Sequence, residues 1–193
     1  MEQEFDTFTK AGFARLLRLF ENTDDVVRLT RAFSLAARAH KGETWNKSEP
    51  YINHPLRVAL ILAEELQIHD LDLACAALLH DTLEQNYAQE LSEFGDRVIS
   101  VTRMVSSEPR PKSEVASDNA LAKYFQDLAK SPKDARVVKS AEKLDSARGM
   151  KNQGFMEKAK RFKDEVQKYV LPIAEGTNDK LAFKLSVALY ELK

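Results

Sequence analysis

Cysteine is almost absent from this chain, because Cys75 is the only one among its 193 residues. A single cysteine excludes an internal disulfide and any zinc site built from several thiolates. Cys75 lies within an apolar run over residues 73–79, so we expect it to be a small buried hydrophobic residue. Glycine and proline are also scarce, at six each, which leaves long stretches where nothing interrupts a helix.

Long apolar runs and an excess of charge are lacking as well. No stretch has the length of apolar residues that a bilayer-spanning helix needs, and the N-terminus lacks the basic and then apolar order of a secretory signal. The 29 basic and 30 acidic residues leave a net charge of −1. This balance gives no support for a protein held to a nucleic-acid polymer or a membrane by bulk electrostatics. We therefore expect a cytoplasmic protein, and a homo-oligomer remains open.

The chain is rich in apolar residues at helical spacing. This pattern predicts helices over about 24–40, 55–66, from Asp70 or Asp72 past His80, and then over 96–105, 117–130, 133–150, 155–171 and 178–192. No strand-like alternation persists anywhere. The sequence thus predicts one all-α domain over residues 1–193 with about nine or ten helices.

Two of the four histidines stand in unusual surroundings. His54 precedes Pro55 at an expected loop-to-helix junction, and His80 precedes Asp81 at the end of an apolar helix. A buried His-Asp pair is costly unless something binds it, and a divalent metal takes a neutral imidazole and a carboxylate as ligands. Glu84 is expected on the same helical face, where its carboxylate could take a proton from an attacking water. Hydrogen-bonded core histidines and a surface acid are the simpler interpretation.

A second group of charged residues lies over 139–146. Glu142 and Asp145 are three positions apart, with Lys139 and Lys143 alongside them. A solvated face with salt bridges would explain this pattern. The functional alternative is a further metal ligand, with the lysines attracting a phosphate.

Three motifs follow one another along the chain: Tyr51-Ile52-Asn53-His54-Pro55, Ala76-Ala77-Leu78-Leu79-His80-Asp81-Thr82-Leu83-Glu84 and Lys139-Ser140-Ala141-Glu142-Lys143-Leu144. In order and spacing they resemble the HD-type hydrolase domain of the Rel/SpoT alarmone enzymes, above all the small stand-alone members. The resemblance implies an all-α HD-domain bundle without the synthetase domain of the long members. It also implies a metal-dependent phosphohydrolase of a phosphorylated nucleotide, with removal of the 3′-pyrophosphate from guanosine 3′,5′-bis(diphosphate) as the best single prediction.

The resemblance also assigns roles by position. It implies one divalent metal, Mn²⁺ before others, held by His54, His80, Asp81 and Glu142. It makes Glu84 the catalytic carboxylate. Contacts to the substrate would come from Lys47, Tyr51, Gln85, Lys139, Lys143 and Ser146.

Some positions depart from the family pattern. Gln85 stands where the family has an Asp, Glu142 where it has an Asp, and Ser146 where it has an Asn. Trp45 begins the pair that is basic in the family, which leaves Lys47 as a substitute. These changes concern the substrate more than the metal, since nitrogen and oxygen ligands suit several divalent metals. Two alternatives therefore stay open: a phosphatase or phosphodiesterase for another nucleotide, and a catalytically silent nucleotide-binding domain.

Overall fold

Helices make up most of the part of the chain that this computed structural model describes, which is residues 5–45, 49–106, 114–151 and 156–192. The residues form two compact units, 1–103 and 104–193. The prediction of an all-α fold is confirmed.

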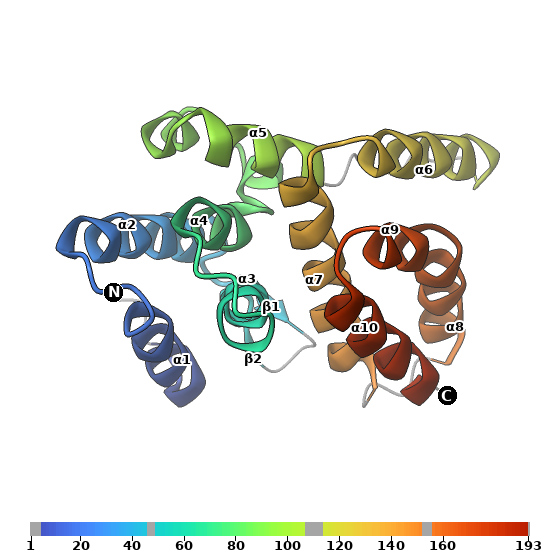
Figure 1. Ribbon diagram of the computed structural model, residues 1–193, viewed down its shortest axis with the longest axis horizontal. Coiled ribbons are helices and arrows are strands. Elements are labelled where there is room, and N and C mark those ends of the chain that lie inside the picture. The colour runs from blue at the N-terminus through green and yellow to red at the C-terminus, as the bar shows by residue number, and fades with distance from the viewer. Residues whose placement is uncertain (1–4, 46–48, 107–113, 152–155, 193) are drawn as a thin grey trace. The chain divides into compact units, whose positions relative to one another are not determined.

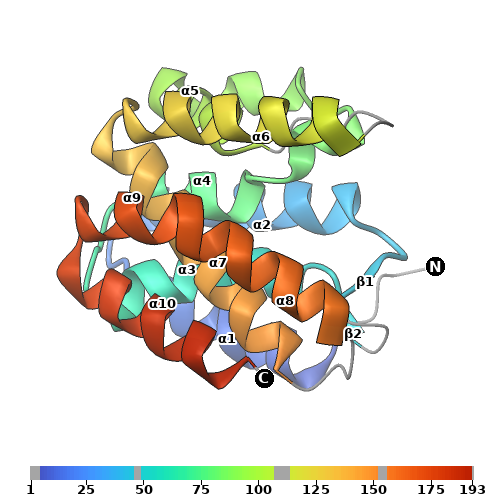
Figure 2. The same ribbon diagram turned by 90° about the vertical axis from the view of Figure 1, so that its right-hand side faces the viewer.

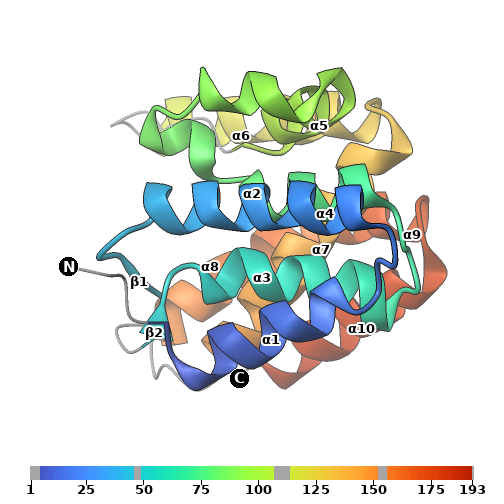
Figure 3. The same ribbon diagram turned by 90° about the vertical axis from the view of Figure 1, so that its left-hand side faces the viewer.

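The first unit is built around one short apolar helix. Its helices are α1 (Thr7–Leu17), α2 (Thr23–Ala39), α3 (Asn53–Leu60), α4 (Leu71–Leu79) and the first part of α5 (Asp96–Val105). Helix α4 packs against α2 and α3, and α3 packs against α1, as Figures 1 and 3 show. All residues of α4 from 73 to 79 are buried, as expected for a helix that is covered on every side.

Side-chain caps fix where these helices begin. The side chains of Asp6, Asn22 and Asp70 each accept a hydrogen bond from a backbone N–H in the first turn of α1, α2 and α4. Such caps satisfy amides that have no partner inside the helix. The cap at Asp70 confirms one of the two alternatives that the sequence offered for the start of α4. Helix α1 was not among the predicted helices.

The loop between α2 and α3 carries two strands that the sequence pattern did not indicate. Strand β1 (Thr44–Trp45) pairs antiparallel with β2 (Glu49–Pro50). Gly42 precedes them with a φ of +83°, a backbone conformation that side chains other than glycine's rarely adopt. A ladder this short leaves no run of alternating residues, so periodicity could not reveal it.

The second unit consists of helices joined by short turns in its described residues. Its helices are α6 (Glu114–Ala129), α7 (Lys133–Met150), α8 (Met156–Glu165), α9 (Leu171–Glu175) and α10 (Asp179–Glu191). Helix α7 packs against α9 and α10, visible in Figure 2. The single helix predicted over 155–171 is instead α8, a π-helical segment (Val166–Val170) and α9. Pro172 explains the interruption, because it brings no N–H for a regular helical bond.

Among the described residues, no helix is both long enough and apolar enough to cross a membrane.

Candidate metal centre

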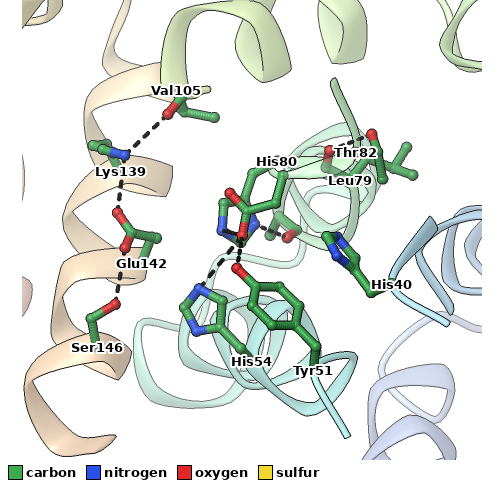
Figure 4. A network of polar contacts seen from close by, with 12 residues as sticks. His40, Tyr51, His54, Leu79, His80, Thr82, Val105, Lys139, Glu142 and Ser146 are labelled. Carbon is green, nitrogen blue, oxygen red and sulfur yellow. Dashed lines mark hydrogen bonds and ion pairs between the residues drawn. The ribbon is translucent and has the colours of Figure 1, made fainter. Parts of the chain in front are cut away.

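Two helix ends in the first unit carry the predicted histidine ligands. His54 lies in the first turn of α3, and His80 directly follows the last residue of α4. Because α3 packs on α4, the two rings meet edge to face with their centroids 5.2 Å apart (Figure 4). Both side chains are buried.

Asp81 completes a cluster of three possible metal ligands. Its Oδ2 atom lies 3.1 Å from His80 Nε2 and 3.9 Å from His54 Nε2. One ligand atom from each of the three residues lies within 4.8 Å of the others. Two imidazole nitrogens and a carboxylate oxygen form a donor set that divalent transition metals take.

The hydrogen bond on the far side of the His80 ring fixes which nitrogen faces Asp81 with a lone pair. His80 Nδ1 lies 2.8 Å from the carbonyl oxygen of Ala77. A carbonyl only accepts, so Nδ1 carries the proton of the neutral ring. The Nε2 lone pair of His80 therefore faces a carboxylate oxygen, and a cation is the partner that suits both atoms.

Asp81 is held in its ionised form. Burial alone would raise the pKa of this carboxyl group. A positive charge at the place of the two imidazoles, which His80 and His54 carry only when they are protonated, and a hydrogen bond from Tyr51 outweigh burial and hold the pKa well below its ordinary value. Beside a neutral His80 ring, a metal cation would supply that charge. The Tyr51 hydroxyl donates to Asp81 Oδ2 over 2.7 Å. Asp81 can therefore offer a full negative charge to a metal at neutral pH.

Aromatic rings enclose His54. The Trp45 indole stacks on the His54 imidazole with centroids 4.1 Å apart and planes 1° apart. Tyr51 meets His54 edge to face and stacks on His40 at 4.4 Å. Sequence reasoning treated Trp45 only as a replaced basic residue, although its being the single tryptophan beside the histidine motif was a usable signal. We infer that the stack restricts rotation of the His54 ring.

The expectation that Glu84 shares a helical face with His80 and Asp81 is wrong. Helix α4 ends at Leu79, and residues Thr82–Gln85 form a separate 3₁₀ turn that closes at Asn86, whose φ is +64°. The Glu84 side chain is exposed. The neighbouring Gln85 donates from Nε2 to Glu43 Oε1 over 2.9 Å.

The charged residues of α7 are engaged with one another inside the second unit. Glu142 is buried; it lies 3.1 Å from Lys139 Nζ and 3.7 Å from Lys143 Nζ, and it accepts a 2.9 Å hydrogen bond from Ser146 (Figure 4). Lys139 is also buried and donates to the carbonyl of Val105. The roles expected for these side chains in ligation and substrate binding stay predictions. Lys47 lies outside the described residues.

The fold and the cluster together define a class. A helical unit that joins a histidine from one helix to a His-Asp dipeptide at the end of another has the composition of an HD-type metal centre. The HD domain family matches residues 32–175. The chain belongs to this family.

Individual proteins similar to this chain come from one branch of enzymes. The bifunctional (p)ppGpp synthase/hydrolase SpoT of Escherichia coli K12 is 30% identical over 165 residues, which are 83% of this chain and 23% of SpoT. The guanosine-3′,5′-bis(diphosphate) 3′-pyrophosphohydrolase MESH1 of Danio rerio is 32% identical over 138 residues, or 67% of this chain and 72% of MESH1. The chain thus spans about a quarter of the long relatives but most of this short one.

A solved structure agrees with these relatives. The structure of a metazoan ortholog of SpoT, described as hydrolysing ppGpp, matches with a TM-score of 0.74 and 25% identity. The match covers 85% of this chain and 94% of that one. The resemblance to the Rel/SpoT hydrolase domain and its small stand-alone members is confirmed.

Proposed function

We propose that this chain is a metal-dependent phosphohydrolase that removes the 3′-pyrophosphate from guanosine 3′,5′-bis(diphosphate). The observation that carries the proposal is the cluster of the buried His54 and His80 with the half-buried Asp81, in a chain similar to MESH1 over most of that protein. We further propose that the two units act as one HD-type domain, because the family match runs through both. A cytoplasmic location fits a nucleotide substrate and a free Cys75 thiol.

The residues of the cluster fit a divalent metal, for which we propose Mn²⁺. His54, His80 and Asp81 would hold it, and we propose Glu142 as the fourth ligand because its motif on α7 resembles that of the family. When bound, the metal supplies a Lewis acid for a phosphate oxygen and lowers the pKa of water. The ionised Asp81 would offset part of the metal's charge, and Tyr51 orients Asp81 through its hydrogen bond.

Glu84 is the proposed general base. Its exposed carboxylate stands on a short turn that begins directly after Asp81, so a substrate entering from solvent can meet it. In the reaction, Glu84 takes a proton from water while the water oxygen bonds to phosphorus. The bond between phosphorus and the 3′ oxygen breaks, pyrophosphate leaves, and the 3′ oxygen takes up a proton.

Substrate contacts are proposed for the remaining predicted side chains, which are Lys47, Tyr51, Gln85, Lys139, Lys143 and Ser146. Most of those described already have a protein partner, as Ser146 does in Glu142. A phosphate oxygen would therefore have to replace an existing acceptor. Lys143 is the least constrained of the two α7 lysines, because both its carboxylate partners, Glu142 and Glu165, lie 3.7 Å away.

The test combines metal analysis with turnover. Purified protein would be assayed for bound metal and, with Mn²⁺ added, for pyrophosphate released from guanosine 3′,5′-bis(diphosphate) and from other phosphorylated nucleotides. His80→Ala and Asp81→Ala should lose metal and turnover together, whereas Glu21→Gln, at an exposed site before α2, should keep both.

Other outcomes would replace the proposal. Release of phosphate from a different nucleotide would make the protein a phosphatase or phosphodiesterase of another specificity. Nucleotide binding without turnover would make it a silent binding domain. Full metal content and turnover in the His80→Ala variant would mean that the cluster is not the metal site of the reaction.

A further inference from the structure

The Glu43 carboxylate connects two segments of the chain, one before His54 and one after Asp81 in the sequence. Glu43 Oε2 lies 2.9 Å from His40 Nδ1, and Glu43 Oε1 accepts a 2.9 Å hydrogen bond from Gln85 Nε2. An ionised carboxylate can only accept, so both partners must donate, and His40 carries its proton on Nδ1. We call these three residues, His40, Glu43 and Gln85, the carboxylate clamp.

The backbone holds Glu43 in place for this contact. Gly42 turns the chain with its positive φ, and the Glu43 carbonyl accepts a 3.1 Å hydrogen bond from the Tyr51 amide. Glu43 is 39% exposed at its side chain, while His40 is 2% exposed. The His40 end of the clamp therefore lies in the core, while its central carboxylate reaches the surface.

Both ends of the clamp lead to proposed functional groups. At the buried end, the His40 ring stacks on Tyr51, whose hydroxyl donates to Asp81 (Figure 4). At the other end, Gln85 is the last residue of the 3₁₀ turn that carries Glu84. The clamp thus restrains the turn at the residue next to the proposed base.

We propose that Glu43 is a positioning residue for the reaction: it fixes the turn that presents Glu84 and supplies, beside position 85, the carboxylate that the family pattern has at position 85 itself. This inference rests on the proposed function. Gln85 alone looks like the loss of an acid. Gln85 and Glu43 together, however, are an amide and an acid in contact, and the negative charge lies on Glu43.

Glutamate and glutamine have the same shape, which allows the clamp to be tested by exchange. In Glu43→Gln, the new amide can keep its oxygen on His40 only by turning its N–H₂ toward Gln85, whose amide must then flip to present Oε1, and the negative charge that strengthened both contacts is lost. In Gln85→Glu, two carboxylates face each other. In the double variant Glu43→Gln/Gln85→Glu, the amide at position 43 accepts from His40 and donates to the carboxylate at position 85, so both contacts return.

The experiment measures kcat and KM for guanosine 3′,5′-bis(diphosphate) with Mn²⁺, together with Mn²⁺ affinity and the free energy of unfolding. Each single variant should lower kcat by about tenfold to a hundredfold, as loss of a supporting contact does, and the double variant should return to within about threefold of the wild type. In Glu43→Gln, KM and Mn²⁺ affinity should change little. Glu21→Gln is the matched control.

Each alternative outcome separates the claims. A Glu43→Gln variant with wild-type kcat, or a double variant as slow as the two single effects multiplied, would overturn the positioning role. Loss of Mn²⁺ along with kcat would overturn it too, because the clamp would then support the ligands. If the wild type turns over no nucleotide, the proposed function fails. The unfolding cycle still decides the clamp, which fails if the Glu43 and Gln85 effects are additive.

Discussion

Replacing Tyr51 by phenylalanine removes one hydroxyl and leaves its aromatic contacts in place. The ring would still stack on His40 and meet Trp45 and His54 edge to face. The hydrogen bond to Asp81 Oδ2, 2.7 Å long, would be lost. Tyr51→Phe therefore isolates the contribution of one donor to the proposed metal ligand.

The size of the effect follows from the charge of the acceptor. A hydrogen bond to an ionised group contributes about 2 kcal/mol to stability, roughly twice a bond between neutral groups. For a chain of this length, that loss lowers Tm by about 4–8 °C. Loss of a group that orients a ligand also weakens metal binding, by about tenfold or more.

The pH dependence has a definite sign. The pKa of Asp81 lies below its ordinary value, so the stability that its ionised form provides is complete above the ordinary range, near pH 4, and is lost only as pH falls through the lowered pKa. The destabilisation by Tyr51→Phe should therefore be the same at pH 7 and at about pH 5.

Tyr124→Phe provides the matched control. The Tyr124 hydroxyl donates over 2.9 Å to the neutral carbonyl of Val105, so its loss should cost only about 1 kcal/mol and leave Mn²⁺ affinity unchanged. Thermal unfolding and Mn²⁺ titration of both variants measure the two effects. Equal destabilisation by the two variants, or wild-type Mn²⁺ affinity in Tyr51→Phe, would refute the reasoning.

Three further predictions concern other residues. Trp45 is the single tryptophan and stacks on His54, so Mn²⁺ should quench the protein's tryptophan fluorescence at one equivalent, and His80→Ala should abolish the change. Glu142→Ala should weaken Mn²⁺ affinity by about tenfold and Asp145→Ala by less; the reverse order would give the ligand role to Asp145. Burial raises the pKa of Cys75 to about 12, so a thiol reagent at pH 8 should modify it only after unfolding, and fast reaction of the native protein would contradict its burial.

Local signals predicted the supports of the cluster well. Pro55 after His54 indicated the start of a helix, and α3 begins at Asn53. The unbroken apolar run before His80 indicated a helix covered on all sides, and α4 is one. Both histidines thus stand at the ends of two helices that the core packs together. The positions of these two candidate ligands can be predicted from sequence, because capping and burial depend on neighbours within a few residues.

The end of α4 could not be read in the same way. In the sequence, the helical spacing of apolar residues continues past Leu79, because Leu83 follows one turn later. In the structure, Asp81 has φ −99° and ψ −2°, and Thr82 turns its hydroxyl back to the Leu79 carbonyl. Such a side-chain bond competes with the helical one and favours termination. The spacing of Glu84 from His80 and Asp81 would place all three on one face only if the helix continued. Because α4 ends at Leu79, that prediction is wrong.

The contact of Glu43 with Gln85 is one that comparison by position does not reveal. Position 85 taken alone lacks an acid, which argues against hydrolysis. Glu43 lies 42 positions earlier in a loop without periodicity, and nothing local connects the two. Their contact depends on Gly42, on the short strands and on the turn after α4 being formed together. A reaction depends on where the negative charge lies in space. A carboxylate on a different residue can therefore replace the family's acid if a hydrogen bond holds it beside the same position. On the proposal made above, Gln85 and Glu43 together take the place of the family's acid at position 85, with the charge on Glu43.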